Sequence, residues 1–283
     1  MNVSAQSEGH LLSTMSLGVG TFLGEILDVL LPRVCPFCRH ATPSGQNPFC
    51  TSCAESFASF RPPFCNACGR PLPASFQESE SLVCTTCLHC FQPPCPDSPV
   101  RCVGPYEGNL REAVLRLKYG RDLLLGPALG TWMASRFRVL FPQDSFDLIL
   151  PVPLHRTRLR SREFNQSVLL ARPLARSLRR PLELKAVLRV RDTPSQSLYR
   201  RGDRRRNLKG AFRVANPGRI RNRSVLIVDD VFTTGATAAA LAALLFDSGA
   251  TGVSVFCLAR TLDPPLSQPE PMIATGPHET EAP

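Results

Sequence analysis

The chain has 283 residues, of which 43% are hydrophobic, and it carries a formal net charge of +10. This length accommodates one full α/β domain and a smaller unit, with enough apolar residues for a sizeable core. No basic region precedes the first apolar run, and Glu25 and Asp28 interrupt that run, which argues against a signal peptide or a membrane span. We therefore expect a cytoplasmic protein.

The positive charge is concentrated in one segment. Residues 155–223 contain 21 Lys and Arg but only four Asp and Glu, so the rest of the chain is net acidic. Such a segment suits a polyanionic ligand, either a pyrophosphate-bearing small molecule or a nucleic-acid backbone. A solvated basic surface without a ligand is the alternative.

The two ends of the chain are expected to lie outside the folded body. Residues 1–33 predict a flexible leader with a short amphipathic helix, whose apolar face contains Leu23, Ile26, Leu27 and Leu30. Residues 263–283 are acidic, rich in proline and poor in large apolar side chains, which predicts disorder.

Residues 34–96 are rich in cysteine and proline and predict a double zinc ribbon. Eight cysteines form four Cys-x-x-Cys pairs, and two such pairs complete one tetrahedral structural zinc site. Gly69 suits the tight turn of such a knuckle. Spacing alone does not say which pairs share a metal, and redox-active pairs or an iron–sulfur cluster are less apt alternatives. The predicted ligands are Cys35, Cys38, Cys50, Cys53, Cys65, Cys68, Cys84 and Cys87.

Residues 97–262 alternate apolar strands with helices. This order predicts a parallel sheet with helices on both faces, in the α/β class. Ligands of such sheets bind beyond the carboxyl ends of the strands. The predicted helices cover 109–120, 124–140, 165–178 and 236–249, and the predicted strands cover 146–153, 224–230 and 253–260.

The predicted strand at 224–230 consists of an apolar run that ends in Asp229 and Asp230. The sequence Thr-Thr-Gly-Ala-Thr follows at 233–237. We expect the two carboxylates to be exposed at the rim of the sheet, where they can accept hydrogen bonds from a sugar diol. The threonine-rich loop opens a helix and offers backbone N–H groups to a phosphate. Together they fit a ribose 5-phosphate. A Walker loop and a dinucleotide fingerprint are both missing, and a metal-binding aspartate pair is the remaining alternative.

The stretch Val225–Thr237, VLIVDDVFTTGAT, resembles the phosphoribosyl pyrophosphate (PRPP) signature of type I phosphoribosyltransferases. The chain from about Leu30 to Thr261 resembles the ComF family of competence-associated proteins, including the segments GPYEGNLREAVLRLKYG and LILPVPLHRTRLRSREFNQS. The resemblance implies a phosphoribosyltransferase-like domain behind a double zinc ribbon. It also implies binding of PRPP with Mg²⁺, a role in DNA uptake, and single-stranded DNA and competence-machinery proteins as partners.

The same resemblance implies a set of site residues. The PRPP-binding residues are Asp229, Asp230, Val231, Thr233, Thr234, Gly235, Ala236 and Thr237. The residues on the pyrophosphate side are Pro153, Leu154, His155, Arg158, Arg162, Asn165 and Gln166. The flap residues are Thr193, Gln196, Arg204 and Asn207. Lys118 also matches and is expected either to reach a phosphate or to lie at a solvated helix end, and the family usually has glycine in place of Glu163.

The resemblance leaves two activities open. One is a phosphoribosyltransferase that passes the pentosyl group to an unknown acceptor through an oxocarbenium-like ribose, with the protein supplying positioning and charge stabilisation. The other is a non-catalytic zinc-ribbon adaptor that binds nucleic acid and keeps the PRPP site for sensing or docking. No residue is identified as a general base.

Overall fold

The computed structural model describes residues 34–42, 47–65, 68–72, 98–141, 146–192, 208 and 210–262. The predictions for the leader, the tail, Cys84, Cys87 and the four flap residues lie outside this part of the chain.

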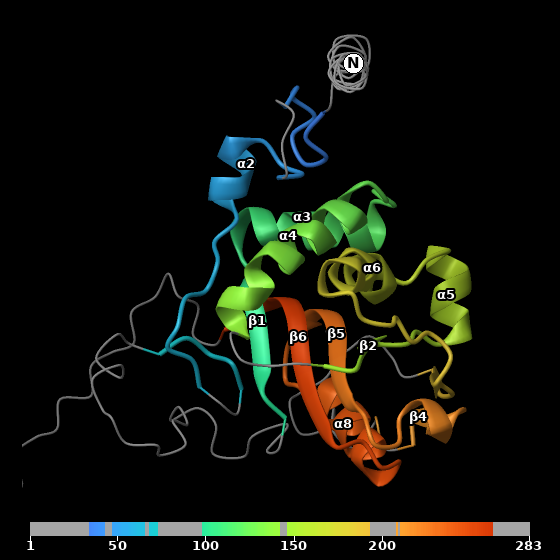
Figure 1. Ribbon diagram of the computed structural model, residues 1–283. Helices are drawn as coiled ribbons and strands as arrows, with labels where there is room; N and C mark the ends of the chain where they lie inside the picture. Colours follow the sequence, from blue (N-terminus) through green and yellow to red (C-terminus); the bar gives the residue numbers. More distant parts are fainter. Residues whose placement is uncertain are drawn as a thin grey trace, which may run out of the picture.

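A four-stranded parallel sheet forms the centre of the fold. Its spatial order is β1 (Val100–Pro105), β6 (Gly252–Arg260), β5 (Ser224–Phe232) and β2 (Leu148–Pro151) (Figure 1). The three strands that the sequence predicts are present. Strand β1 has no clear strand pattern in the sequence, because Arg101 and Gly104 interrupt its short apolar run.

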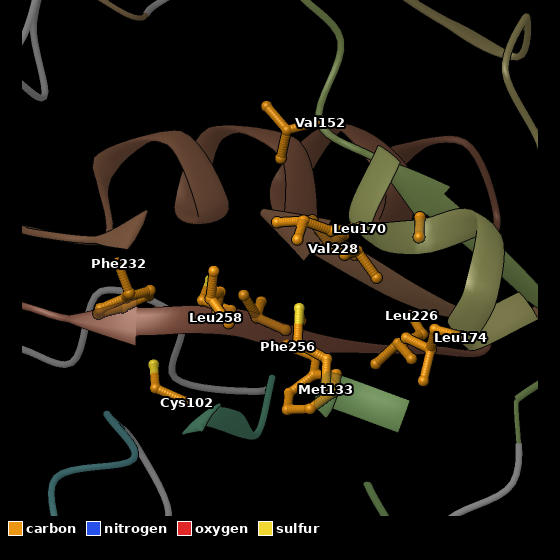
Figure 2. Packing of buried hydrophobic residues seen from close by; sticks show 14 of the residues in the cluster. Cys102, Met133, Val152, Leu170, Leu174, Leu226, Val228, Phe232, Phe256 and Leu258 are labelled. Carbon is orange, nitrogen blue, oxygen red and sulfur yellow. The ribbon is translucent and has the colours of Figure 1, made fainter. Parts of the chain in front are cut away.

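Helices cover both faces of the sheet, as the alternation of strands and helices predicts. The four predicted helices correspond to α3 (Gly108–Tyr119), α4 (Leu125–Leu140), α6 (Gln166–Leu178) and α8 (Ala236–Asp247). Figure 2 shows Leu170 of α6 next to Val228 of β5, within one buried cluster. Ile227, the residue before Val228 in β5, points to the opposite face of the sheet, where it lines a small cavity together with Ala238 of α8.

Smaller elements flank the sheet beyond β2. Helix α5 (Arg156–Arg162) follows β2 directly, and β3 (Val187–Arg189) pairs with β4 (Phe212–Val214) in antiparallel fashion. None of them is predicted by periodicity. Helix α5 is arginine-rich and buries no residue, and each of the two strands has only three residues, so none of them carries a repeating apolar pattern.

The cysteine-rich region packs directly onto the α/β body. The N–H of Phe60 donates to the carbonyl of Val103 at 2.7 Å. Phe57, which follows α2 (Thr51–Ser56), contacts Trp132 of α4 with ring centroids 5.4 Å apart. At Gly104 a β-carbon would collide with the carbonyl oxygen of Ala58, so the absence of a side chain permits this close approach. The two regions therefore share one hydrophobic cluster.

The cap of α5 generates a stability prediction. Glu163 ends this helix with φ of +67°, a left-handed conformation in which a β-carbon costs about 1–2 kcal/mol. Glu163→Gly and Glu163→Ala both remove the charge, but only glycine also removes the β-carbon. We expect the glycine variant to exceed the alanine variant by about 1 kcal/mol in the free energy of unfolding, measured by urea denaturation. Equal stability of the two variants would contradict a strained cap.

Candidate functional site

A cleft of about 400 Å³ opens at the carboxyl end of the sheet. Strand β2 ends at Pro151, opposite Val228, whereas β5 continues to Phe232 alongside β6. Because β2 stops early, the last residues of β5 border a cleft on that side instead of another strand. Helices α3, α5 and α6 contribute the other walls.

Asp229 and Asp230 line this cleft, and each is held by another element. Ser167 of α6 donates its hydroxyl to Oδ1 of Asp229 at 2.9 Å, and the N–H of Asp230 donates to the same oxygen at 2.9 Å. Lys118 of α3 places Nζ 3.1 Å from Oδ1 of Asp230. The expectation of two exposed carboxylates is therefore wrong, because Asp230 is only 8% exposed and Asp229 is partly buried. The side chain of Lys118 is 18% exposed and pairs with Asp230, so Lys118 is not a solvated helix end.

The electrostatics of this cluster explain how it tolerates two adjacent carboxylates. Burial and the charge of Asp230 raise the pKa of Asp229 to about 7, against the opposing effects of the Asp230 N–H, Lys118 and Ser167. Burial opposes the charge on Lys118, but Asp230 and then Asp229 raise the pKa of the ammonium overall. Near neutral pH the cluster thus carries much less negative charge than two free aspartates, so it repels a phosphate ligand less.

Both carboxylates keep an oxygen for a ligand. The contacts above use Oδ1 of each aspartate, and Oδ2 of each has no hydrogen-bond partner within the described part of the chain. Two carboxylate oxygens on neighbouring residues can accept hydrogen bonds from two neighbouring hydroxyl groups.

The threonine loop that follows β5 leads into α8. Gly235 is the N-cap of this helix with φ of +75°, a conformation that favours glycine. Thr233 and Thr237 line the cleft together with Val231, and Gly235 and Ala236 line a small cavity next to it. The hydroxyl of Thr234 is buried and has no hydrogen-bond partner among the described residues. The Thr234 hydroxyl and the backbone N–H groups at the start of α8 are therefore candidate donors to an anion.

Arginines form one wall of the cleft. Arg158 and Arg162 of α5 line it together with Gln166 of α6, and all three are among the residues that the resemblance assigns to the pyrophosphate side. The wall also contains Arg189, which is 8% exposed and lies over the ring of Phe212. Burial and the nearby charge of Arg158 lower the pKa of Arg189. Positive charges therefore converge on this wall.

Several residues that the resemblance assigns to the pyrophosphate side do not line the cleft or have a second structural role. Pro153 and His155 line a separate groove, and Leu154 lines both the groove and the cleft. The Asn165 amide donates to the carbonyl of Val152 at 3.0 Å and accepts from the N–H of Ser167 at 3.0 Å, so it caps α6. His155 similarly caps α5. Ser167 and Arg189 also line the cleft but are not among the predicted site residues, because their positions depend on tertiary contacts.

The first two cysteine pairs form one cluster. The sulfurs of Cys35, Cys38, Cys50 and Cys53 all lie within 4.8 Å of one another, which fits a tetrahedral zinc ion. The geometry therefore answers a question that the spacing left open, because the first and second pairs converge. Although burial opposes ionisation of Cys35, hydrogen bonds from the backbone of Cys38, Cys50 and Phe37 lower its pKa to about 6.

The third pair repeats the knuckle of the first. The N–H of Cys35 donates to the carbonyl of His40 at 2.8 Å, and that of Cys65 donates to Arg70 at 2.8 Å. Gly69 has φ of +70°, as expected for a tight turn, and a β-carbon there would collide with the carbonyl oxygen of Val100. Cys65 and Cys68 are both buried.

The first knuckle contacts the helix that carries Lys118. Arg116 of α3 donates from Nη1 to the carbonyl of Phe37 at 2.7 Å, between Cys35 and Cys38. Its Nη2 donates to Asp122 at 2.7 Å, and its guanidinium lies 5.1 Å from the centre of the Phe37 ring. The zinc knuckle therefore fixes the end of α3 only two residues from the lysine of the cleft.

Comparisons with known proteins bear on both regions. Residues 26–96 match the model of the double zinc ribbon domain. The DNA utilization protein YhgH of Escherichia coli K12 is 39% identical over 181 residues, which cover 62% of this chain and 78% of that protein. Competence protein ComFC of Bacillus subtilis is 30% identical over 162 residues, which cover 57% and 64%.

Among solved structures, a purine phosphoribosyltransferase from Pyrococcus horikoshii shares 17% identity over 48% of this chain and 83% of its own, with a TM-score of 0.30.

Within the described ranges, the helices are too short or too polar to cross a bilayer.

The knuckle geometry predicts the metal content. We expect about two zinc ions per purified chain, and about one after Cys35→Ser and Cys38→Ser are introduced together, because that pair belongs to a single site. Elemental analysis by mass spectrometry measures both values. Cys102→Ala removes a buried cysteine outside the zinc ribbon and should leave the zinc content unchanged. An unchanged zinc content in the double-serine variant would contradict the assigned site.

Proposed function

The chain belongs to the ComF family, which includes YhgH and ComFC, and on this basis we propose that it binds PRPP with Mg²⁺ in the cleft and acts in DNA uptake or utilization. In this proposal residues 34–96 form the double zinc ribbon and residues 97–262 form the phosphoribosyltransferase-like domain. Single-stranded DNA and proteins of the competence machinery are the proposed partners.

One observation carries the proposal for PRPP. The cleft has carboxylates near the end of β5 that can accept hydroxyl groups, and the start of α8, whose N–H groups can bind an anion, lies six residues after Asp230. A ribose 5-phosphate has the matching ends, since its diol can bind Oδ2 of Asp229 and Asp230 while its phosphate binds the loop at 233–237.

The arginine wall is the proposed site of the pyrophosphate. Arg158 and Arg162 line the cleft together with the aspartates, and guanidinium groups bind phosphate oxygens in bidentate fashion. Lys118 is paired with Asp230, so we assign it to holding the carboxylates and not to direct phosphate binding. Mg²⁺ would be held largely by the pyrophosphate and hydroxyls of the ligand and would neutralise part of their negative charge.

If the ligand turns over, the bond between C1 of the ribose and the pyrophosphate oxygen breaks, and the electron pair leaves with pyrophosphate. The arginine wall would stabilise the departing charge, and the aspartates would hold the sugar while positive charge develops on it. The acceptor that then bonds to C1 is not defined by the residues of the cleft. We therefore propose ligand binding and leave the acceptor unassigned.

A non-catalytic nucleic-acid adaptor is the second candidate. It is favoured by the strong positive charge of residues 155–223, and the described part of this segment exposes many arginines. The relatives named for DNA utilization and for competence agree with such a role. In this alternative the PRPP site would serve as a sensor or a docking point. Exposed arginines include Arg156, Arg160, Arg172, Arg176, Arg179, Arg180, Arg213, Arg219 and Arg221.

Asp229→Asn tests the PRPP site. The variant removes a charged acceptor whose hydrogen bond to a hydroxyl contributes roughly 1.5–3 kcal/mol. We expect the affinity for PRPP with Mg²⁺, measured by calorimetry at pH 8, to fall at least about tenfold, at about 1.4 kcal/mol per decade. The exposed Asp247, at the end of α8, provides the matched control, and Asp247→Asn should not change the affinity.

The raised pKa of Asp229 adds two expectations for the same variants. The parent affinity should increase from pH 6 to pH 8 as Asp229 ionises, and the increase should be smaller in Asp229→Asn. Because a raised carboxyl pKa destabilises the fold as the pH rises from about 4 to about 7, the ligand-free asparagine variant should be at least as stable as the parent at pH 8. Unchanged PRPP affinity in this folded variant would contradict the assigned role.

Salt dependence tests the nucleic-acid role. Affinity for a single-stranded oligonucleotide should fall steeply with added salt, because each phosphate neutralised by an arginine releases a counterion, with a log–log slope of about −0.7 per contact. Fluorescence anisotropy, measured at salt concentrations from about 50 to about 200 mM, gives the slope. An affinity that hardly changes would argue against a basic binding surface.

A further inference from the structure

A second concave surface lies beyond β2. This groove has a volume of about 770 Å³ and is bounded by α5, α6 and β3, away from Asp229 and Asp230. It is larger than the cleft, and most of the residues that line it have no role in the proposed PRPP site. It therefore needs a separate explanation.

The groove exposes apolar side chains to solvent. Leu159 of α5, Leu188 of β3 and the nearby Leu184 and Val190 all line it, with between 38% and 45% of each residue exposed. Single exposed apolar residues are common on protein surfaces, but several that share one concave site mark a place for a ligand or partner. Phe164 adds a partly buried aromatic ring to the same groove.

The charge around these apolar residues is positive. Arg156, Arg172 and Arg213 line the groove and are exposed, and none of them has an ion-pair partner among the described residues. Among the described residues of the lining, Glu163 is the only acidic one, and its carboxylate lies 3.8 Å from Arg121. An occupant with apolar surfaces and regularly spaced negative charges complements this arrangement.

We propose that the groove binds unstacked bases of a single-stranded nucleic acid, with Arg156, Arg172 and Arg213 contacting the flanking phosphates. Apolar and aromatic side chains contact the faces of bases without selecting a sequence, and arginines follow the backbone. This inference rests on the proposed nucleic-acid role and names the surface responsible for it. An uncharged apolar peptide would leave the arginines without partners, and a second copy of this positively charged segment would be repelled.

The groove adjoins the cleft. Leu154 and the buried Arg189 line both of them, so a nucleotide in the groove lies next to a ligand bound at the aspartates. The two proposed ligands therefore occupy neighbouring sites on the same side of the sheet, beyond β2.

The experiment compares two oligomers of equal length and charge, oligothymidylate and the same backbone without bases. The full-length protein should bind oligothymidylate at least about fivefold more tightly, because base contacts of this kind contribute roughly 1–3 kcal/mol per base and 1.4 kcal/mol is a decade. Leu159→Ser with Leu188→Ser should remove this difference and leave the affinity for the base-free oligomer and for PRPP unchanged. Leu123→Ser with Val139→Ser changes exposed apolar residues outside the groove and is the matched control.

Each alternative gives a different result. Equal binding of both oligomers by the parent overturns the groove proposal but keeps a charge-based nucleic-acid role, and this comparison requires no variant to fold. Binding of neither oligomer overturns the nucleic-acid role and the groove proposal together. A parent dimer that dissociates in the groove variant identifies the groove as a contact between copies, which also overturns the proposal.

Discussion

The ion pair between Lys118 and Asp230 is the interaction on which the cleft depends. Two adjacent carboxylates at a partly buried sheet edge repel each other, and without a counter-charge they would also repel any phosphate. Lys118 of α3 supplies that counter-charge, and Ser167 of α6 donates to Asp229. The pair is consequently held by two helices, and one oxygen of each carboxylate makes no such contact. This arrangement makes the acidic pair compatible with the proposed anion-binding loop in one site.

Helix α3, which carries Lys118, also contacts the cysteine-rich region. Arg116 binds the backbone of the first knuckle through Phe37, and it is two residues from Lys118 on α3. At the other knuckle, Arg260 at the end of β6 donates to the carbonyl of Cys68 and lies over the ring of Phe232. Each knuckle thus contacts an element whose end borders the cleft. The cysteine-rich region therefore contacts two of the elements that border the cleft, and its first part also shares the main hydrophobic cluster of the α/β body.

The sequence predicts the parts of this protein that depend on local pattern. Long apolar periodicities predict α3, α4, α6 and α8, and the cysteine spacing predicts a four-thiolate cluster. Composition and spacing give no indication that Lys118 meets Asp230, which is 112 residues further along the chain, or that the first two cysteine pairs converge. The burial of Asp230 was missed for the same reason, since it depends on a helix from elsewhere in the chain. Asn165 resembles a ligand in sequence, yet its side chain caps α6.

The central claim is that the aspartates hold the diol of a ribose whose phosphate lies at the start of α8. Calorimetric titration of the unmodified protein with ribose 5-phosphate and with 2-deoxyribose 5-phosphate tests it most directly, since the two sugars differ by one hydroxyl. At pH 8, where Asp229 is mostly ionised, ribose 5-phosphate should bind about tenfold more tightly, because one charge-assisted hydrogen bond contributes roughly 1.5–3 kcal/mol. Equal affinity for the two sugars would contradict the assignment of Asp229 and Asp230 to the diol.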